Sequence, residues 1–459
     1  MVKKMLLHEK QRRVRAIAVV ILCIHLTVVL YTWFQSSRFY LLDGGFSLRL
    51  IALGRLAGLL AVTFALQQFL LIGRIPIFER TFGQDRMSRL HQTTGYLVFG
   101  TILIHPFLLV LGNASLNDLN IFSQYIQFIK GYEDVFKASL AMLCAWAVVI
   151  SSVWIVRRRL KYEWWYAVHL LTYAIILLAF GHQNELGTTV NFTQFFNYYW
   201  YAIYVLVLGT FIFYRFLKPI LSFLKHDFRV MQVVQEAPHV VSIYMRGKNM
   251  EHFKWKPGQF AFFTFLSPGL YLGQHPFSFS YLWDDKRILR ITVKGVGDYT
   301  RLLQEVPVGT KVIIQGPYGI LGRQIEKEFE VLLVAGGIGI TPIRCLFERY
   351  ARSGRDVELV YAARTPQDLA LKPELDALVG LFPNAKVHYL AEHDAGTVPG
   401  VYEGRITKEF LLAAVPNIPN RQAFVCGPPA MADAIEHTLQ SVGMPEKKIY
   451  VERFSLHKK

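Results

Sequence analysis

Long apolar runs separated by short polar connections fill the chain from Ile17 to Phe216. Each run is close to the roughly 20 residues that an α-helix needs to cross the hydrocarbon core of a bilayer. From His226 onward the apolar runs are shorter and turn residues separate them, as in a water-soluble α/β protein. The pattern therefore predicts an all-α bundle of six membrane spans followed by soluble domains. The expected spans are Val14–Phe34, Leu48–Ile72, Leu90–Leu111, Ala138–Val156, Trp164–Phe180 and Tyr198–Leu217.

Basic residues alternate between the two ends of the expected spans. The basic connections hold Lys3, Lys4, Lys10, Arg12, Arg13 and Arg15 before the first span, Arg74, Arg80, Arg86 and Arg89 after the second, and Arg157, Arg158, Arg159 and Lys161 after the fourth. The other connections hold only Arg38, Lys130 and the marginal Lys137. Because Lys and Arg accumulate on the cytoplasmic side, we expect an integral plasma membrane protein whose termini and soluble half are cytosolic. The first apolar run lacks a small-residue cleavage site, which indicates a retained span rather than a signal peptide.

Composition narrows the classes of protein that remain. Hydrophobic residues make up 53% and charged residues 18% of the 459 residues, which excludes a disordered or collagen-like chain. The net charge of +17 is explained largely by the basic membrane connections, so no nucleic-acid partner is expected. The cysteines at 23, 144, 345 and 426 have no ligand-like spacing, which argues against a zinc site or a disulfide framework.

Four histidines lie within two of the expected spans, His91 and His105 in the third and His169 and His182 in the fifth. A polar side chain at membrane depth is costly and marks a candidate functional site. On a helix, the step from His91 to His105 turns by roughly −40° and rises by roughly 21 Å, so both rings project from one face. The step in the fifth span separates its rings by about 140°. We attribute this misfit to a backbone that leaves helical dihedrals at Gly181.

The third and fifth spans run in the same direction, which pairs His91 with His169 near the cytosol and His105 with His182 near the outside. Two facing imidazoles at each level can hold a haem iron from both axial positions, so the pattern predicts two b-type haems. The alternative is that these histidines only form hydrogen bonds between helices. His25 has no partner at its level and is expected to pack or to hydrogen-bond between helices.

Short β-rich runs from Phe228 to Pro317 predict a small antiparallel barrel. Examples are Phe260–Phe265, Phe277–Tyr281 and Ile288–Val293. The residues from Lys294 to Thr300, KGVGDYT, lead into a short helix at Tyr299–Gln304. A glycine-rich turn that opens a helix can aim backbone N–H groups at an anion such as pyrophosphate, although most such turns are only turns.

Strands and helices alternate after the barrel, which predicts a doubly wound parallel sheet. The expected elements are strand Phe329–Ala335, helix Thr341–Arg352, strand Asp356–Ala362, helix Lys372–Val379, strand Lys386–Ala391, helix Thr407–Ala413, strand Gln422–Cys426 and helix Ala430–Val442. The first strand leads into AGGIGITP at 335–342, a turn that lets a dinucleotide approach the backbone, although it lacks the usual G-x-G-x-x-G spacing. Arg364 follows the second strand, where it could bind the 2′-phosphate of NADPH or be a plain surface residue.

In combination, these features resemble the ferric reductase and NADPH oxidase superfamily over nearly the whole chain. The residues that carry the resemblance are the two histidine pairs, the run His275-Pro276-Phe277-Ser278, the GDYT run, Gly316-Pro317-Tyr318-Gly319, the GGIGITP turn, the Cys426-Gly427-Pro428-Pro429 strand end, and Phe454 near the C-terminus. The resemblance implies a six-helix haem domain at 1–222, an FAD-binding barrel at 223–325 and an NAD(P)H-binding α/β domain at 326–459. The unequal histidine steps also occur in that family.

The resemblance also implies roles for individual residues. Ser278 would lie near the reactive flavin nitrogen, and Phe454 would stack on the flavin face that nicotinamide must reach. The FAD-binding set would be His275, Pro276, Phe277, Ser278, Val293, Lys294, Gly297, Tyr299, Thr300 and Phe454. The NADPH-binding set would be Gly336, Gly337, Gly339, Thr341, Pro342, Arg364, Cys426, Gly427 and Pro428.

Arg55 resembles the arginine that oxidases of this family place near the outer haem, with a catalytic role beside that of Phe454. A snorkelling surface arginine is the alternative. The chain departs from the family at Leu109, where some oxidases have a polar residue, and in the five residues that follow Phe454. The first departure bears on the choice of acceptor, and the second on the flavin-stacking role expected for Phe454.

The implied activity is electron transfer from NADPH, with NADH as an alternative donor, through FAD and two bis-histidine haems to an external small molecule. A flavin is required because nicotinamide donates two electrons whereas a haem iron accepts one. The acceptor is O2, giving superoxide, or in the closest alternative a ferric chelate. The partners expected are that acceptor and the lipid bilayer, without an obligatory protein subunit. A second alternative is a non-enzymatic membrane scaffold with a degenerate reductase tail.

Overall fold

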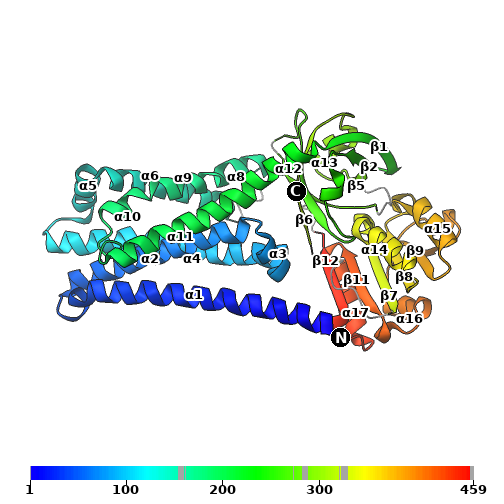
Figure 1. Cartoon of the computed structure of the whole chain (residues 1–459), viewed down its shortest axis with the longest axis horizontal. Helices are drawn as coiled ribbons and strands as arrows, with labels where there is room; N and C mark the ends of the chain where they lie inside the picture. The colour runs from blue at the N-terminus through cyan, green and yellow to red at the C-terminus, as the bar shows by residue number, and fades with distance from the viewer. Residues whose placement is uncertain are drawn as a thin grey trace. The chain divides into compact units, whose positions relative to one another are not determined.

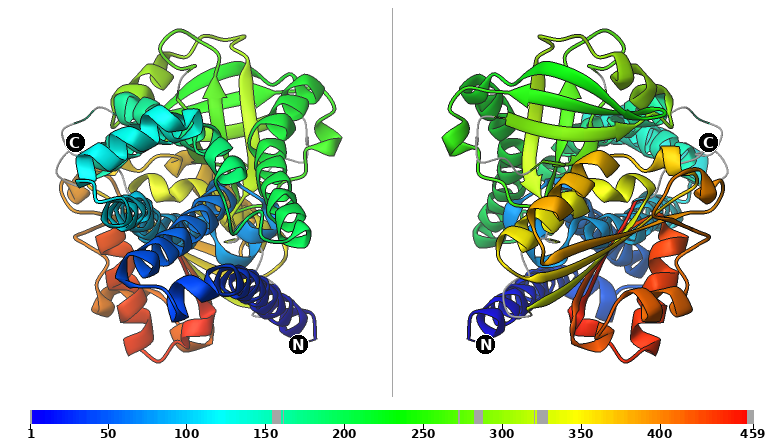
Figure 2. Two further views of the ribbon diagram at one scale, coloured as in Figure 1. Left: turned by 90° about the vertical axis from the view of Figure 1, so that its left-hand side faces the viewer. Right: turned by 90° about the vertical axis from the view of Figure 1, so that its right-hand side faces the viewer.

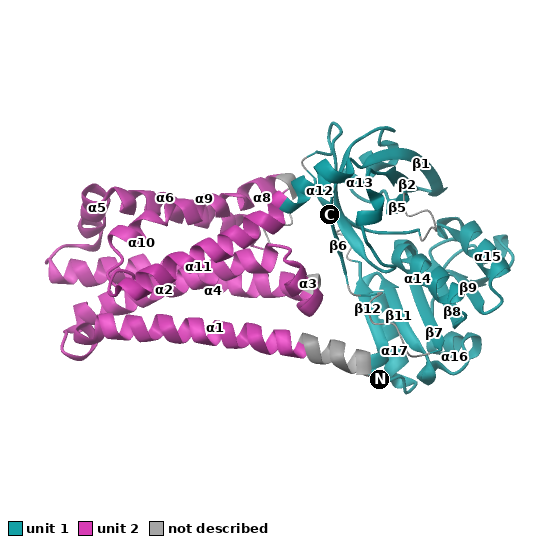
Figure 3. Ribbon diagram, viewed as in Figure 1, with its two compact units in different colours: residues 1–5, 218–459 teal, residues 6–217 magenta. Residues whose placement is uncertain are grey.

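The computed structural model describes residues 2–153, 160, 162–271, 273–281, 288–319, 321 and 329–454. The chain folds into two compact units (Figures 1 and 3). The first unit contains residues 6–217, and the second contains residues 218–459 together with residues 1–5. Arg157, Arg158, Arg159, Lys161 and the end of the fourth expected span lie outside the described residues.

The first unit is helical. Its helices are α1 (Val2–Leu42), α2 (Phe46–Ile72), α3 (Pro76–Phe82), α4 (Gln84–Leu116), α5 (Ile121–Gly131), α6 (Glu133–Ser152), α8 (Tyr162–His169), α9 (Leu171–Leu178), α10 (Gly181–Glu185) and α11 (Gln194–Ile212), which continues through a π-turn (Phe213–Leu217). Within the described residues, six helical segments are long and apolar enough to cross a membrane: Arg12–Leu42, Phe46–Ile72, Arg86–Leu116, Glu133–Ser152, Trp164–Glu185 and Gln194–His226. The six expected spans are confirmed, and the chain is an integral membrane protein.

Aromatic side chains of α11 form the core of this unit. Phe196, Trp200, Tyr204, Val207 and Phe211 are buried and recur every three or four residues, so they share one face of the helix. They pack in one cluster with Val29 of α1 and with Leu59, Leu66 and Phe69 of α2. The opposite face of α11 is apolar and exposed, as a helix facing lipid should be.

The second unit begins with α12 (Lys218–His226) and an antiparallel barrel. Its strands are β1 (Arg229–Ala237), β2 (Val240–Arg246), β3 (Phe260–Phe265), β4 (His275–Ser278), β5 (Ile288–Lys294) and β6 (Val312–Tyr318). They form two three-stranded sheets, β1-β2-β5 and β4-β3-β6. The single bridges Arg229–Lys311 and Phe279–Ile291 join the sheets around an apolar core. The expected barrel is confirmed (green in Figure 2).

The rest of the second unit is a six-stranded parallel sheet with the order β10-β9-β8-β7-β11-β12. Its elements are β7 (Glu330–Gly336), α14 (Ile340–Arg352), β8 (Asp356–Ala363), α15 (Lys372–Leu381), β9 (Ala385–Ala391), β10 (Val401–Glu403), α16 (Lys408–Ala414), β11 (Gln422–Gly427), α17 (Pro429–Ser441) and β12 (Ile449–Arg453). The doubly wound sheet is confirmed (yellow to red in Figure 2). The sequence analysis missed the edge strands β10 and β12.

Alternate residues of each strand serve opposite faces of this sheet. Val331, Leu333 and Ala335 of β7 pack in one cluster with α14 and α15. Leu332 and Val334 of the same strand pack in another cluster with α16 and α17. Both faces are therefore covered, which leaves the carboxyl ends of the strands as the edge open to a ligand.

Arg421, directly before β11, is fully buried at the amino end of the parallel sheet, where it bonds to residues of neighbouring strands. Its guanidinium pairs with Asp356 Oδ2 at 2.9 Å and donates to the carbonyls of Pro416 and Val331. Asp356 is 37% exposed and can be solvated by water, so the cost of losing Arg421 comes mainly from the two carbonyls left without a donor, together about 3–5 kcal/mol.

We therefore expect Arg421→Ala to destabilise the second unit by about 3–5 kcal/mol. Thermal unfolding followed with a thiol-reactive dye measures this effect, because Cys345 and Cys426 are fully buried in the same sheet domain. Arg405→Ala is the matched control, since Arg405 pairs with Glu392 while 80% exposed and should contribute about 1 kcal/mol or less. Equal melting shifts for the two variants would contradict the assignment.

Candidate functional site

The structure brings the four membrane histidines together as two pairs. The ring centroids of His91 and His169 are 6.1 Å apart, and those of His105 and His182 are also 6.1 Å apart. His91 and His105 lie on α4, while His169 ends α8 and His182 lies in α10. The pairing is that expected from the sequence.

Helix α2 fixes the ring of His105. The Nδ1 atom lies 2.8 Å from the carbonyl oxygen of Gly54, which leaves Nε2 free to face the partner ring. A Cβ at Gly58 would lie 2.7 Å from the same Nδ1 atom, so only glycine allows this approach. The spacing of four between Gly54 and Gly58 is the small-residue pattern that lets membrane helices pack closely. The sequence held this signal, although the sequence analysis did not use it.

Helix α2 also contacts His91, because the side-chain amide of Gln68 lies against its Nδ1 atom. The ring of His169 stacks on Trp165 one turn earlier, with centroids 4.9 Å apart. The Nδ1 atoms of His169 and His182 are buried without a hydrogen-bond partner in the described part of the chain.

The fifth span is broken into three short helices, and these breaks explain the misfit of its histidine spacing. One break lies at Leu170, where the Thr172 hydroxyl donates to the carbonyl of His169, and another lies at Ala179 and Phe180. The explanation from Gly181 was wrong, because Gly181 lies inside α10 and has no positive φ. Its role is steric, since a Cβ there would lie 2.6 Å from the buried Asp134 carboxylate.

The residues present fit two haems. Among the residues that the structure describes, no group of three or more His, Cys, Asp or Glu side chains could hold a metal ion. Each level therefore offers two protein ligands, which suits an ion whose other positions are filled by a macrocycle. Two imidazoles that share one ion at about 2 Å per nitrogen have ring centroids about 6 Å apart, close to the 6.1 Å of both pairs.

Two other polar residues of the membrane helices have partners. The guanidinium of Arg55 lies 4.4 Å from the ring centroid of Tyr40, one residue after the Gly54 carbonyl that contacts His105. His25 lies 2.9 Å from the hydroxyl of Tyr199 and 3.0 Å from that of Thr63, so it hydrogen-bonds between helices as expected.

In the second unit, β4 carries His275 to Ser278 and pairs with β3 inside the barrel wall. The ring of His275 stacks on Tyr299, with centroids 3.9 Å apart. The Tyr299 hydroxyl donates to the carbonyl of Gly273, and the ring lies where a Cβ of residue 273 would be. Gly273 therefore permits the stack, which connects the expected flavin strand to the GDYT turn.

In and beside the GDYT turn, groups expected to bind a diphosphate form hydrogen bonds and an ion pair within the protein. The backbone N–H groups of Val296 and Gly297 both donate to the Thr300 hydroxyl at 3.0 Å, so Thr300 caps the short helix α13 (Asp298–Leu302). Lys294 pairs with Asp368 at 3.5 Å. The side chain of Val293 is buried in the barrel core, so only its backbone can contact a ligand.

Glycines shape the loop at the end of β7. Gly337 has a φ of +52°, a conformation that favours glycine. A Cβ at Gly336 would overlap Met431, and one at Gly339 would overlap the carbonyl of Cys426. The Thr341 hydroxyl, at the start of α14 with Pro342, donates to the carbonyl of Ile338. These glycines bring the loop against the Cys426-Gly427-Pro428 strand end, as the dinucleotide motif requires.

Phe454 and Arg364 lie at this same carboxyl edge of the sheet. The backbone N–H of Phe454 donates to the carbonyl of Gly427 at 2.8 Å, and its ring packs partly buried against the core. Arg364 directly follows β8 with an exposed side chain, and its carbonyl accepts from the backbone of His393. Both residues therefore follow strands at the edge of the sheet where the nucleotide is expected.

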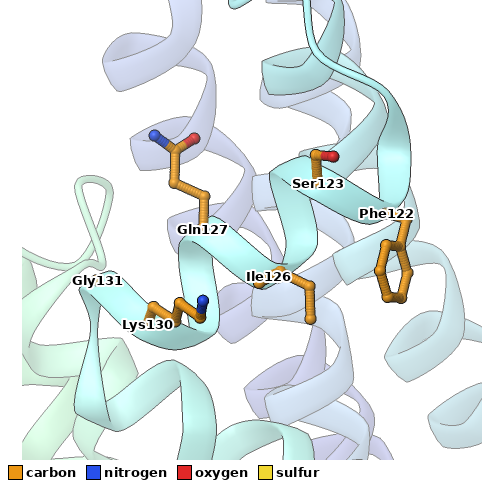
Figure 4. Close-up of a pocket in the computed structure, with 6 residues that line it drawn as sticks. All are labelled: Phe122, Ser123, Ile126, Gln127, Lys130 and Gly131. Carbon is orange, nitrogen blue, oxygen red and sulfur yellow. The ribbon is translucent and has the colours of Figure 1, made fainter.

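A shallow hollow also runs along α5 (Figure 4). Its lining residues all belong to that helix: Phe122, Ser123, Ile126, Gln127, Lys130 and Gly131. None of the histidines, flavin-motif or nucleotide-motif residues lines it, so we assign it no part in the chemistry.

Comparison with known proteins covers both units. The ferric reductase like transmembrane component family matches residues 57–180, an FAD-binding domain family matches residues 225–321, and an oxidoreductase NAD-binding domain family matches residues 333–437.

Similar proteins match the soluble half. The glycine betaine monooxygenase reductase subunit of Chromohalobacter salexigens is 26% identical over 246 residues, 50% of this chain. The chain covers 64% of that relative, less than two thirds of its length. NADH-cytochrome b5 reductase 1 of Eremothecium gossypii is 30% identical over 206 residues, 39% of this chain and 71% of its own length. The cytochrome b5 reductase domain of Ulva prolifera nitrate reductase aligns with a TM-score of 0.44 and 18% identity, over 50% of this chain and 97% of that domain.

The contact between Gly58 and His105 gives a test of the outer histidine pair. Gly58→Val should push the His105 ring from its place and reduce bound haem from about two to about one per chain. A pyridine-haemochrome assay measures this ratio. Gly209→Val is the control, because Gly209 is exposed on α11 and a Cβ there meets nothing within 4 Å. Unchanged haem content in Gly58→Val would refute the assignment of His105 as a ligand.

Proposed function

This chain belongs to the ferric reductase and NADPH oxidase superfamily, and we therefore propose that it transfers electrons from cytosolic NADPH across the membrane to an external small molecule. The observation that carries the proposal is a pair of facing imidazoles at each of two levels of the bundle. Within each pair, the ring centroids are 6.1 Å apart. The proposed domains are a haem domain at 1–222, an FAD domain at 223–325 and an NAD(P)H domain at 326–459.

The cofactors supply the redox chemistry, because a bound flavin accepts a hydride and releases single electrons that two haem irons can carry in turn. The chain supplies the ligands and the geometry. His91 with His169 and His105 with His182 would hold the two haems. Arg55 would supply a positive charge near the outer pair, on the side where the external acceptor would receive its electron.

In the second unit, the strand from His275 to Ser278 would line the flavin. Lys294 would bind its diphosphate together with the turn that Thr300 caps. The glycine loop at 336–339 would hold the pyrophosphate of the dinucleotide, followed by Thr341 and Pro342. Phe454 would cover the flavin face that nicotinamide must reach. The distribution of basic residues supports a plasma membrane location with both termini in the cytosol.

The proposed acceptor is O2, giving superoxide. A ferric chelate is the second candidate, and one observation favours it. Leu109, one turn after His105, is apolar where some oxidases of the family have a polar residue, and it lies against Gly54 in the contact between α4 and α2. The same electron path would serve either acceptor.

Purified protein supplemented with FAD and given NADPH tests the function directly. We expect oxygen consumption and superoxide that superoxide dismutase removes, with a ferric chelate assayed in parallel. Faster reduction of the chelate than of oxygen would make the chain a metalloreductase. Haem-free protein without NADPH oxidation would refute the proposal and leave a membrane scaffold.

A second prediction concerns the preference for NADPH over NADH, which we assign to Arg364. A guanidinium forms charge-assisted hydrogen bonds to a phosphate, each contributing about 1.5–3 kcal/mol, whereas NADH presents only a hydroxyl there. Arg364→Ala should therefore raise the KM for NADPH by roughly ten- to a hundredfold. Steady-state kinetics with NADH on the same variant provides the control and should change little. Equal weakening of both nucleotides would mean that Arg364 supports the loop instead.

A further inference from the structure

A buried cluster of charges lies where the barrel meets the parallel-sheet domain within the second unit. Arg290 of β5 and Arg344 of α14 are each 2% exposed, and both pair with Glu374 of α15, whose side chain is 25% exposed. The Arg290 pair has an N–O distance of 2.8 Å and joins residues 84 positions apart in the sequence. One carboxylate thus connects the barrel to both helices on one face of the sheet.

Arg290 is anchored firmly on the barrel side. It donates to the Ser280 hydroxyl at 3.1 Å, to the Ser280 carbonyl, and to the Tyr244 hydroxyl at 3.1 Å. Ser280 also accepts a hydrogen bond from Thr292. Because Ser280 lies two residues after Ser278, the arginine holds the strand that carries the expected flavin motif.

Arg344 is anchored on the sheet side. It pairs with Glu348 at 2.5 Å one turn along α14. Since Arg344 lies two residues after Pro342, it belongs to the first turns of the helix that the expected dinucleotide loop opens. The cluster therefore links the segment that follows the expected flavin motif to the helix that follows the expected dinucleotide loop.

Two further contacts cross the same joint. The ring centroid of Tyr281 lies 4.7 Å from the guanidinium carbon of Arg290 and 4.9 Å from that of Arg344. The Cys345 thiol donates to the carbonyl of Phe279 at 3.2 Å. Burial raises the pKa of Cys345 to about 12, so the thiol stays protonated and keeps this bond at physiological pH.

Stability alone is a poor reason to bury these charges, because apolar residues of similar volume are often as stabilising as a buried ion pair. The other described contacts of the joint orient it weakly. They include the Lys294–Asp368 pair, which is longer at 3.5 Å than the 2.8 Å of Arg290 and Glu374 and has no fully buried member, and a small apolar cluster of Ala237, Val240, Ala370 and Ile338. The hydrogen bonds of Arg290 to Glu374, Ser280 and Tyr244 are directional and specify one alignment, which apolar contacts between small side chains do not.

We propose that Glu374 is a positioning residue that, through Arg290 and Arg344, fixes the flavin-bearing strand against the nucleotide-bearing helix and so sets the distance for hydride transfer. This inference rests on the proposed function. It assigns Glu374 no contact with substrate. It requires that the cluster control the rate of flavin reduction and not the binding of either cofactor.

The test is stopped-flow reduction of FAD by NADPH in the full-length protein. Glu374→Gln keeps the shape of the side chain and removes its charge. Because misplacement by about 1 Å can cost a hundredfold in rate, flavin reduction at saturating NADPH should slow by about ten- to a hundredfold. FAD affinity, NADP⁺ affinity and the haem spectrum should remain at wild-type values.

Lys372→Gln is the matched control, because Lys372 lies on the same helix and its described contacts, with Asp376 at 2.7 Å and with the ring of Tyr389 in β9, stay within the sheet domain. Arg290→Lys is the second variant, which keeps the charge but not the fork that reaches Ser280 and Glu374 together, and it should slow the same step. Wild-type reduction rates in both Glu374→Gln and Arg290→Lys would overturn the inference. So would a parallel loss of FAD and NADP⁺ affinity, which would indicate general destabilisation. Wild-type protein whose flavin NADPH does not reduce would instead refute the proposed function.

Discussion

The close approach of α2 to α4 determines where the ring of His105 points, and the outer half of the proposed electron path depends on it. Glycines at 54 and 58 bring the α2 backbone against that ring, so the Gly54 carbonyl accepts from Nδ1 and leaves Nε2 for a ligand. A membrane interior offers no water to satisfy a misplaced imidazole, so an alternative orientation is costly. Gln68 contacts His91 from the same helix. One helix thus orients both histidines of α4.

In the second unit the constraint is the alignment of two domains, because the expected flavin and dinucleotide motifs must lie at a defined distance from each other. The barrel presents its flavin strand at His275 to Ser278, and the sheet presents its glycine loop at the carboxyl end of β7. Each domain has its own apolar core, and the apolar cluster that joins the two contains only small or partly buried side chains and Val240. The buried pairs of Glu374 cross that joint, in line with the wider rule that buried polar networks favour one arrangement over many.

Much of this arrangement could be predicted from the sequence, because apolar periodicity reports burial directly. The six spans, the barrel and the parallel sheet follow from runs of characteristic length and spacing. The edge strand β10 is only Val401–Glu403, too short for a periodic signal. The break at Leu170 depends on a local hydroxyl contact, and Gly181 is required by Asp134 of another helix, so spacing alone misassigned its role. Glu374 gave no signal, since its partners are brought to it only by the tertiary fold.

The central claim is that electrons cross the membrane through haems held by the paired histidines. Proteoliposomes with an impermeant acceptor test it most directly. Ferricyanide is trapped inside the vesicles and NADPH is added outside, so only molecules with their nucleotide domain outward receive reductant. The account predicts that wild-type protein reduces the trapped ferricyanide and that His105→Leu does not, although its flavin is still reduced by NADPH. Reduction of trapped ferricyanide at the wild-type rate by His105→Leu would contradict it.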